Sequence, residues 1–103
     1  MGHDVGRLKI VPTGEYRPIF CDLYDKTTKT LVEAKGSVTR EAVRMAIGQL
    51  LDYRRFVDEP VRLSVLLPEQ PRPDLMALLE SVDVEAQWPT DLGFVSSSLI
   101  TAQ

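Results

Sequence analysis

The sequence is poor in the residues that build covalent and metal-bound structural sites. It has one cysteine, Cys21, which excludes an internal disulfide, and one distant histidine, His3, so a structural zinc site is excluded as well. No apolar run approaches the roughly 18 residues of a membrane span, and no Gly-rich phosphate loop is present. The amino terminus lacks the apolar core of a signal peptide. We therefore expect a cytoplasmic protein with no membrane partner.

Charge is unevenly distributed along the 103 residues. The net charge of −3 argues against a generally basic nucleic-acid-binding protein. However, residues 26–62 carry 8 basic and 5 acidic groups, whereas residues 63–103 carry 1 and 6. Any capacity to bind anions should therefore lie in the middle third. The length and the 44% hydrophobic content are those of a single globular domain over residues 1–103.

Three segments in the first third of the chain are typical of strands, because they alternate polar and apolar residues or are rich in β-formers. They span residues 7–12, 16–24 and 31–35. Turn chemistry at Pro12-Thr13-Gly14 and over the polar stretch 25–30 separates them. We expect these strands to form an antiparallel meander.

The most regular segment follows at residues 40–57, where strong helix formers carry apolar residues at helical spacing and Ser37 or Thr39 can act as the cap. Further elements are expected at 61–67 (strand), 75–81 (helix capped by Asp74), 84–88 (strand) and 89–103 (weakly ordered tail). The order strand, helix, strand implies a parallel, right-handed pairing. The expected fold class is α/β, in the α+β sense of a mixed sheet: a meander followed by βαβ crossovers.

A charged pair lies within the third strand, in the stretch LVEAKGS. Glu33 and Lys35 share one side of the strand, because side chains alternate with a period of two. A two-residue loop at 27–28 would make paired positions sum to 55 and place Asp22 opposite Glu33, whereas a bulge in the turn would shift this register by one. Two carboxylates about 5 Å apart need a positive charge between them, and a divalent cation with oxygen ligands suits this arrangement better than Lys35 alone. A solvent-facing alternation is the other interpretation, although Leu31 shares the charged side.

The helix adds a second pair of polar residues. Gln49 and Tyr53 are four residues apart, hence on one face, at the margin of the apolar arc, and we expect them to point inward toward a site. The alternative is a helix flank whose tyrosine simply packs. Gly48 costs about 1 kcal/mol relative to alanine inside a helix, which suggests close packing against a neighbour or a ligand.

Together these residues resemble a known superfamily. Asp22, then Glu33-Ala34-Lys35, then Gln49-Leu-Leu-Asp-Tyr53 looks like the core of the PD-(D/E)XK nucleases, the restriction-endonuclease-like fold, with a Gln-x-x-x-Tyr helix similar to that of the RecB-type branch. The match covers roughly residues 7–67. The stretch EAKGSVTREAVRMAIGQLLDYRRF also resembles domains at the carboxyl end of larger bacterial proteins. We expect the first helix of that fold to be missing or truncated in this chain.

The resemblance implies Mg²⁺-dependent hydrolysis of phosphodiester bonds in DNA, with Mn²⁺ as a second usable metal. Asp22 and Glu33 would be metal ligands, the Ala34 carbonyl would be a third, and Lys35 would orient water or offset negative charge. Gln49 and Tyr53 would support the site or hold the nucleic-acid backbone.

The arginines of the helix, Arg40 and Arg44 followed by Arg54 and Arg55, form either a phosphate-contacting stripe or a solvated face paired with acidic neighbours. Further domains of a larger protein and a homodimer are the other expected partners. The alternative function is a catalytically inactive module of the same fold that serves nucleic-acid docking or assembly.

Overall fold

The structure, a computed structural model, describes the backbone of residues 5–10 and 19–97 and the side chains from Leu23 onward. The elements of these residues are β1 (Val5–Ile10), β2 (Ile19–Asp25), β3 (Thr30–Ala34), α1 (Arg40–Arg54), β4 (Arg62–Leu66), α2 (Pro73–Ser81), β5 (Val84–Thr90) and β6 (Gly93–Ser96). The strands form one mixed sheet in the order β1-β2-β3-β4-β5-β6, so each strand lies beside its neighbour in the sequence. A mixed sheet with two helices confirms the expected fold class.

The first three strands form the predicted antiparallel meander. In the β2–β3 pair Leu23 lies opposite Val32 and Asp25 lies opposite Thr30, so paired positions sum to 55 as predicted. The strand bounds differ from the expected ones by a few residues at each end, and the predicted turn at 12–14 lies outside the described residues.

The turn between β2 and β3 is longer than predicted. The expected loop covered residues 27–28, whereas the observed turn covers 26–29. Its shape is set by side-chain chemistry: Oδ1 of Asp25 accepts hydrogen bonds from the backbone N–H groups of residues 27 and 28 at 3.0 and 3.3 Å, and Lys29 adopts a left-handed φ of 55°. Both loops are centred on the same point, so the register is unchanged.

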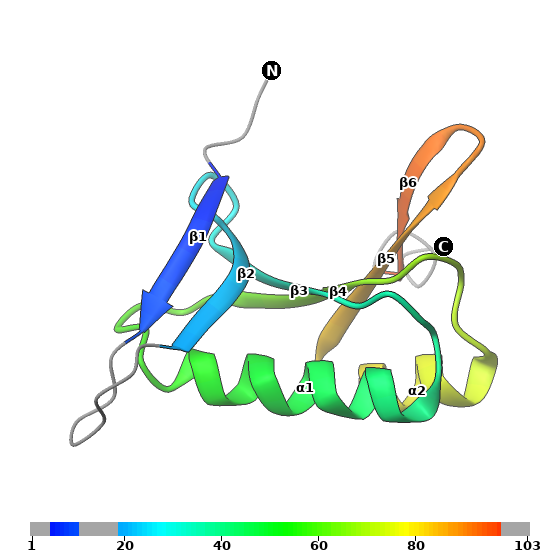
Figure 1. Cartoon of the computed structure of the whole chain (residues 1–103), viewed down its shortest axis with the longest axis horizontal. Helices are drawn as coiled ribbons and strands as arrows, with labels where there is room; N and C mark the ends of the chain where they lie inside the picture. The colour runs from blue at the N-terminus through cyan, green and yellow to red at the C-terminus, as the bar shows by residue number, and fades with distance from the viewer. Residues whose placement is uncertain (1–4, 11–18, 98–103) are drawn as a thin grey trace.

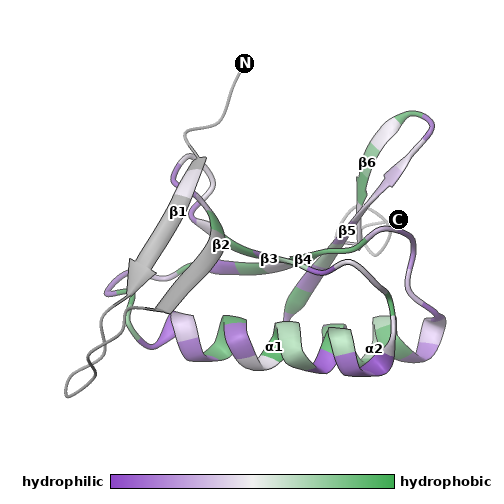
Figure 2. Cartoon of the chain, viewed as in Figure 1, coloured by the Kyte–Doolittle hydropathy of each residue, from purple (hydrophilic) through white to green (hydrophobic). Residues whose placement is uncertain are grey.

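Helix α1 is capped by Thr39, whose Oγ1 accepts a hydrogen bond of 3.2 Å from the N–H of Ala42. It ends at Arg54, three residues before the expected end at 57. Beyond it, backbone N–H groups bond to carbonyls three residues earlier, for example Val57 to Arg54 at 3.2 Å, which tightens and closes the last turn. Figure 2 shows α1 alternating between hydrophobic and hydrophilic residues along its length, as expected of a helix that covers a sheet with one side.

The strands β3, β4 and β5 pair in parallel, as the strand–helix–strand order predicts. Both helices lie on one face of the sheet (Figure 1). The prediction that Asp74 caps α2 is wrong, because Arg72 is the cap residue and Asp74 lies in the first turn. The Asp74 carboxylate instead pairs with the guanidinium of Arg40, at the amino terminus of α1.

The core lies between the sheet and the two helices. Its fully buried members include Leu31 on β3, Val65 on β4, Ala86 on β5 and Leu50 on α1. Alternate strand residues face this core, so the residues between them face the other side of the sheet. Within the described residues neither helix is long and apolar enough to cross a membrane.

The last part of the described chain differs from the sequence expectation. A weakly ordered tail was predicted from residue 89, but β5 continues to Thr90 and pairs antiparallel with β6. Gly93, with φ of 112°, permits the tight turn between the two strands, a conformation that favours glycine. Trp88 is buried and lies opposite Val95. The part of the predicted tail from residue 98 lies outside the described residues.

Candidate active site

Four of the predicted site residues meet where β3 ends and α1 passes beneath it. Strand alternation places Glu33 and Lys35 on the side of β3 that faces α1, the side on which Leu31 enters the core. The four-residue spacing of Gln49 and Tyr53 places both on the sheet-facing side of the helix. Residues far apart in the sequence therefore converge as the pattern predicts.

A chain of polar contacts joins these side chains. The Nζ of Lys35 lies 3.5 Å from Oε2 of Glu33 and donates a hydrogen bond of 2.5 Å to Oε1 of Gln49. The Nε2 of Gln49 in turn donates to the hydroxyl of Tyr53 at 3.4 Å. The amide of Gln49 thus has its oxygen toward the ammonium and its nitrogen toward the phenol.

The carboxylate at the start of this chain is buried. Glu33 is 3% exposed and Tyr53 is 6% exposed, whereas the side chain of Lys35 is 17% exposed. Removing a carboxylate from water costs several kcal/mol unless a cation offsets the charge, and the ammonium of Lys35 lies 3.5 Å from this one. Lys35 therefore lies between the buried carboxylate and the surface, with Gln49 fixing its direction.

Asp22 lies on β2, one residue before the last pair of the β2–β3 ladder. Continued one position beyond the Leu23–Val32 pair, the β2–β3 register aligns Asp22 with Glu33. The pairing of β1 with β2 shifts here, so that Asp22 and Leu23 together lie opposite one residue of β1. Such bulges re-aim side chains and are frequent beside active sites. The side chain of Asp22 lies outside the described residues.

A Mg²⁺ site would need oxygen ligands, mainly carboxylates and carbonyls, because Mg²⁺ is a hard cation. The described side chains contain no cluster of three metal-binding residues. Glu33 supplies one carboxylate, and Ala34 follows it on the same strand with its carbonyl group. The register makes Asp22 the neighbouring position from which a second carboxylate would come. Carboxylate and carbonyl oxygens are the donor type that a divalent cation takes, and the described side chains place one such carboxylate, that of Glu33, at the end of β3.

The two arginines predicted to contact phosphate differ in their surroundings. Arg40 forms an ion pair with Asp74, and the hydrogen bond from Arg40 lowers the pKa of the Asp74 carboxyl group. Arg44 is exposed and has no ion pair within the described residues. The Arg40–Asp74 pair was not predicted, although the two crossovers place the amino termini of both helices at the same end of the sheet. Arg55 pairs with Asp52, as the solvated-face alternative proposed.

Gly48 does not have the close neighbour that the sequence suggested. It is exposed, and a Cβ atom added to it would meet nothing within 4 Å. The interpretation of Gly48 as a close-packing position within this chain is therefore wrong. The side of α1 that carries it faces away from the sheet.

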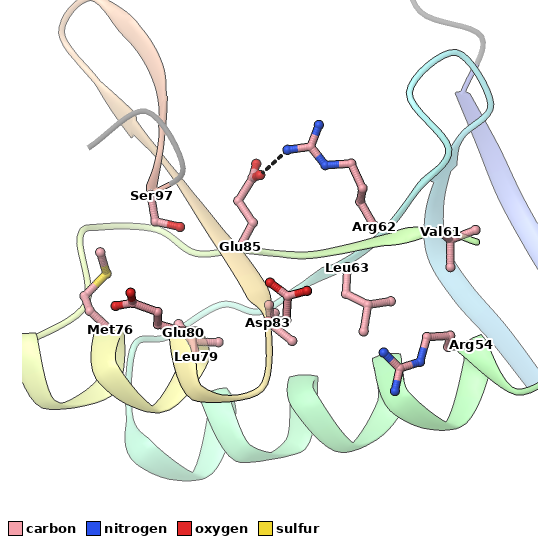
Figure 3. A pocket seen from close by; sticks show the side chains of 11 residues that line it. Arg54, Val61, Arg62, Leu63, Met76, Leu79, Glu80, Asp83, Glu85 and Ser97 are labelled. Carbon is pink, nitrogen blue, oxygen red and sulfur yellow. Dashed lines mark hydrogen bonds and ion pairs between the residues drawn. The ribbon is translucent and has the colours of Figure 1, made fainter. Parts of the chain in front are cut away.

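The hollow drawn in Figure 3 is separate from the candidate active site. It encloses about 390 Å³ at the amino ends of β4 and β5, and Arg54, Glu80 and Asp83 lie among its lining residues. Arg62 and Glu85 form an ion pair of 2.9 Å across its upper edge. Because the strands are parallel, this hollow is at the opposite end from Lys35, and it contains none of the predicted catalytic residues.

Comparisons with protein-family models, with curated proteins and with solved structures find no match to this chain.

Proposed function

We propose that the protein is a metal-dependent nuclease of the restriction-endonuclease-like fold that hydrolyses phosphodiester bonds in DNA. The observation that carries the proposal is the polar chain from Glu33 through Lys35 and Gln49 to Tyr53 at the carboxyl end of β3. An ammonium held between a buried carboxylate and a directed amide is poised to offset negative charge on a phosphate group.

Each residue has a distinct role in this proposal. Glu33 and Asp22 hold Mg²⁺, and the carbonyl of Ala34 is a further oxygen ligand. The bound metal would supply polarisation of the phosphoryl oxygen and activation of water. Lys35 orients the attacking water or stabilises the charge that develops on the phosphate. Gln49 accepts the hydrogen bond that aims Lys35, and Tyr53 holds the amide of Gln49 from the other side.

The burial of Glu33 supports a second candidate function, that of a catalytically inactive module of the same fold. Glu33 is 3% exposed and pairs with Lys35. Such a pair can serve a structural role as well as it can bind a metal ion. In that case exposed basic residues such as Arg44 would dock the nucleic-acid backbone, and no bond would be cleaved.

Cleavage of supercoiled plasmid with Mg²⁺ or Mn²⁺ tests the first candidate. Lys35→Ala should abolish cleavage, whereas Lys26→Ala, which removes an exposed lysine in the β2–β3 turn, should leave it unchanged. Equal cleavage by wild type and Lys35→Ala would refute the assigned mechanism. DNA binding that is sensitive to salt but survives both EDTA and Lys35→Ala, without cleavage, would establish the inactive module instead.

A further inference from the structure

One of the arginines of α1 is held by a carboxylate of the other helix. The guanidinium of Arg40, at the start of α1, forms an ion pair and a hydrogen bond with Asp74 in the first turn of α2. Arg44, one turn further along α1 and on the same face, is exposed and has no ion pair among the described residues. These two neighbouring cations therefore differ, because a carboxylate already occupies the first of them.

The Arg40–Asp74 ion pair lies at the same end of the sheet as Lys35. Both helices begin at that end (Figure 1). The backbone N–H of Lys35 donates a hydrogen bond of 3.0 Å to the carbonyl of Leu66, which joins the segments that lead from β3 and β4 into the helices. Phosphates repeat at every nucleotide of a DNA strand, so a strand that places one phosphate at Lys35 brings its neighbours toward the amino ends of α1 and α2.

The carboxylate of Asp74 is placed so that a phosphate can displace it. Its side chain is 72% exposed and that of Arg40 is 39% exposed, so water reaches both partners. Exposed ion pairs are weak, because water and salt screen the two charges. The hydrogen bond and the charge of Arg40 lower the pKa of Asp74, and the charge of Arg72 lowers it further. Asp74 is therefore ionised at neutral pH and keeps a second cation nearby after it leaves Arg40.

We propose that Asp74 is an autoinhibitory residue, whose carboxylate occupies Arg40 in the free protein and must leave before Arg40 can bind a DNA phosphate. This inference rests on the proposed function, because it concerns the arginines that would hold the DNA backbone. A phosphate that takes Arg40 replaces one ion pair by another, so Arg40 adds little net affinity while Asp74 is present. If the pair served only to join the two helices, its loss would loosen them and would give Arg40 no new contact with DNA.

Fluorescence anisotropy of a labelled DNA duplex tests this proposal, in EDTA to prevent metal-dependent cleavage and at several salt concentrations. Asp74→Asn should strengthen binding about two- to fivefold, the range expected when a competing exposed ion pair is lost. It should also steepen the slope of log affinity against log salt by up to about 1. Arg40→Ala should weaken binding little in the wild-type protein but several-fold in Asp74→Asn, because only that variant leaves Arg40 free for phosphate. Thermal unfolding checks that each variant is folded.

Glu41→Gln is the matched control, because it removes the same charge from an exposed residue next to Arg40 that has no ion pair among the described residues. In this background Arg40→Ala should weaken binding no more than in wild type. If DNA binds but Arg40→Ala costs the same with and without Asp74, the proposal alone is overturned. An equal gain from Glu41→Gln also overturns it and assigns the effect to net charge. No binding by any of these proteins, in EDTA or with Mg²⁺, overturns the proposed function and this inference with it.

Discussion

The Nζ of Lys35 donates a 2.5 Å hydrogen bond to Oε1 of Gln49, and this bond joins the end of β3 to the middle of α1. It fixes the direction of an ammonium that also lies 3.5 Å from the carboxylate of Glu33. Gln49→Leu removes the acceptor and keeps much of the volume. If Lys35 acts in phosphodiester hydrolysis, we expect kcat to fall on the order of 10²-fold with KM little changed, because a catalytic group displaced by about 1 Å loses roughly that much.

Tyr53→Phe is a milder change than Gln49→Leu in the same group of polar contacts. It keeps the buried ring and removes only the hydroxyl, which Gln49 reaches at 3.4 Å. We therefore expect a smaller loss of kcat than for Gln49→Leu. Single-turnover plasmid cleavage measures both variants, and thermal unfolding checks that both are folded. A larger loss for Tyr53→Phe would mean that the hydroxyl, and not the amide, positions Lys35.

Arg44 should contribute more to DNA binding than Arg40. Arg44 is exposed without an ion pair among the described residues, whereas the guanidinium of Arg40 is engaged by Asp74. Arg44→Ala should weaken binding several-fold and reduce the slope of log affinity against log salt by about 1, as expected when one phosphate contact is lost. Fluorescence anisotropy with a labelled duplex at several salt concentrations measures this slope.

Arg55→Ala serves as the control for the arginines, because Arg55 pairs with Asp52 at the carboxyl end of α1. It should leave the salt slope unchanged. An equal effect of Arg44→Ala and Arg55→Ala would show that net charge alone governs binding. In that case the basic residues of α1 would not form a defined interface.

Local patterns predicted most of the fold because they depend on neighbours in the sequence. The β2–β3 register was correct although the loop was longer than expected, since a loop at 27–28 and one at 26–29 share a centre. The loop length depended on how Asp25 bonds to the turn and on the left-handed Lys29. The hairpin beyond residue 89 was missed, because β6 has only four residues and its partner strand, more than the sequence itself, specifies it.

For the candidate site too, local patterns predicted some features, whereas others depend on the tertiary structure. Alternation on β3 and four-residue spacing on α1 predicted that Lys35 and Gln49 would face each other, because both patterns are local. The burial of Glu33 depends on how closely helix and sheet pack, and Arg40 meets Asp74 only because two crossovers bring the helix ends together. Those properties belong to the tertiary structure, which single-sequence patterns do not contain.

Gly48→Ala should stabilise the protein. The position lies inside α1, is exposed and has room for a Cβ atom, so alanine gains its better helix propensity at no steric cost. The expected gain is about 1 kcal/mol, which raises the Tm of a domain of this size by about 4 to 8 °C. Differential scanning calorimetry measures the shift. A loss of DNA binding or cleavage by the stabilised variant would show that a ligand approaches the backbone at Gly48.

Glu59 should make stability depend on pH, because it joins the β2–β3 turn to the loop before β4. Its carboxylate accepts hydrogen bonds from Lys29 at 2.8 Å and from the hydroxyl of Tyr24 at 3.0 Å, and these bonds lower the pKa of Glu59. A carboxyl group whose pKa is lower in the folded state stabilises the fold above its unfolded pKa, and this contribution is lost as pH falls through the folded pKa.

Glu59→Gln should therefore lower the urea midpoint at about pH 7, by the small amount typical of an exposed ion pair, and the difference from wild type should vanish at about pH 3. On the alkaline side, desolvation and the bond to Glu59 raise the pKa of Tyr24, and the bond to Glu59 raises the pKa of Lys29. Their contributions hold below the unfolded pKa values and are lost as pH rises through the folded ones. Glu69→Gln is the control, because it removes an exposed carboxylate that has no ion pair among the described residues. It should show no such pH dependence. An equal response from Glu69→Gln would mean that net charge, and not the contacts of Glu59 with Lys29 and Tyr24, causes the effect.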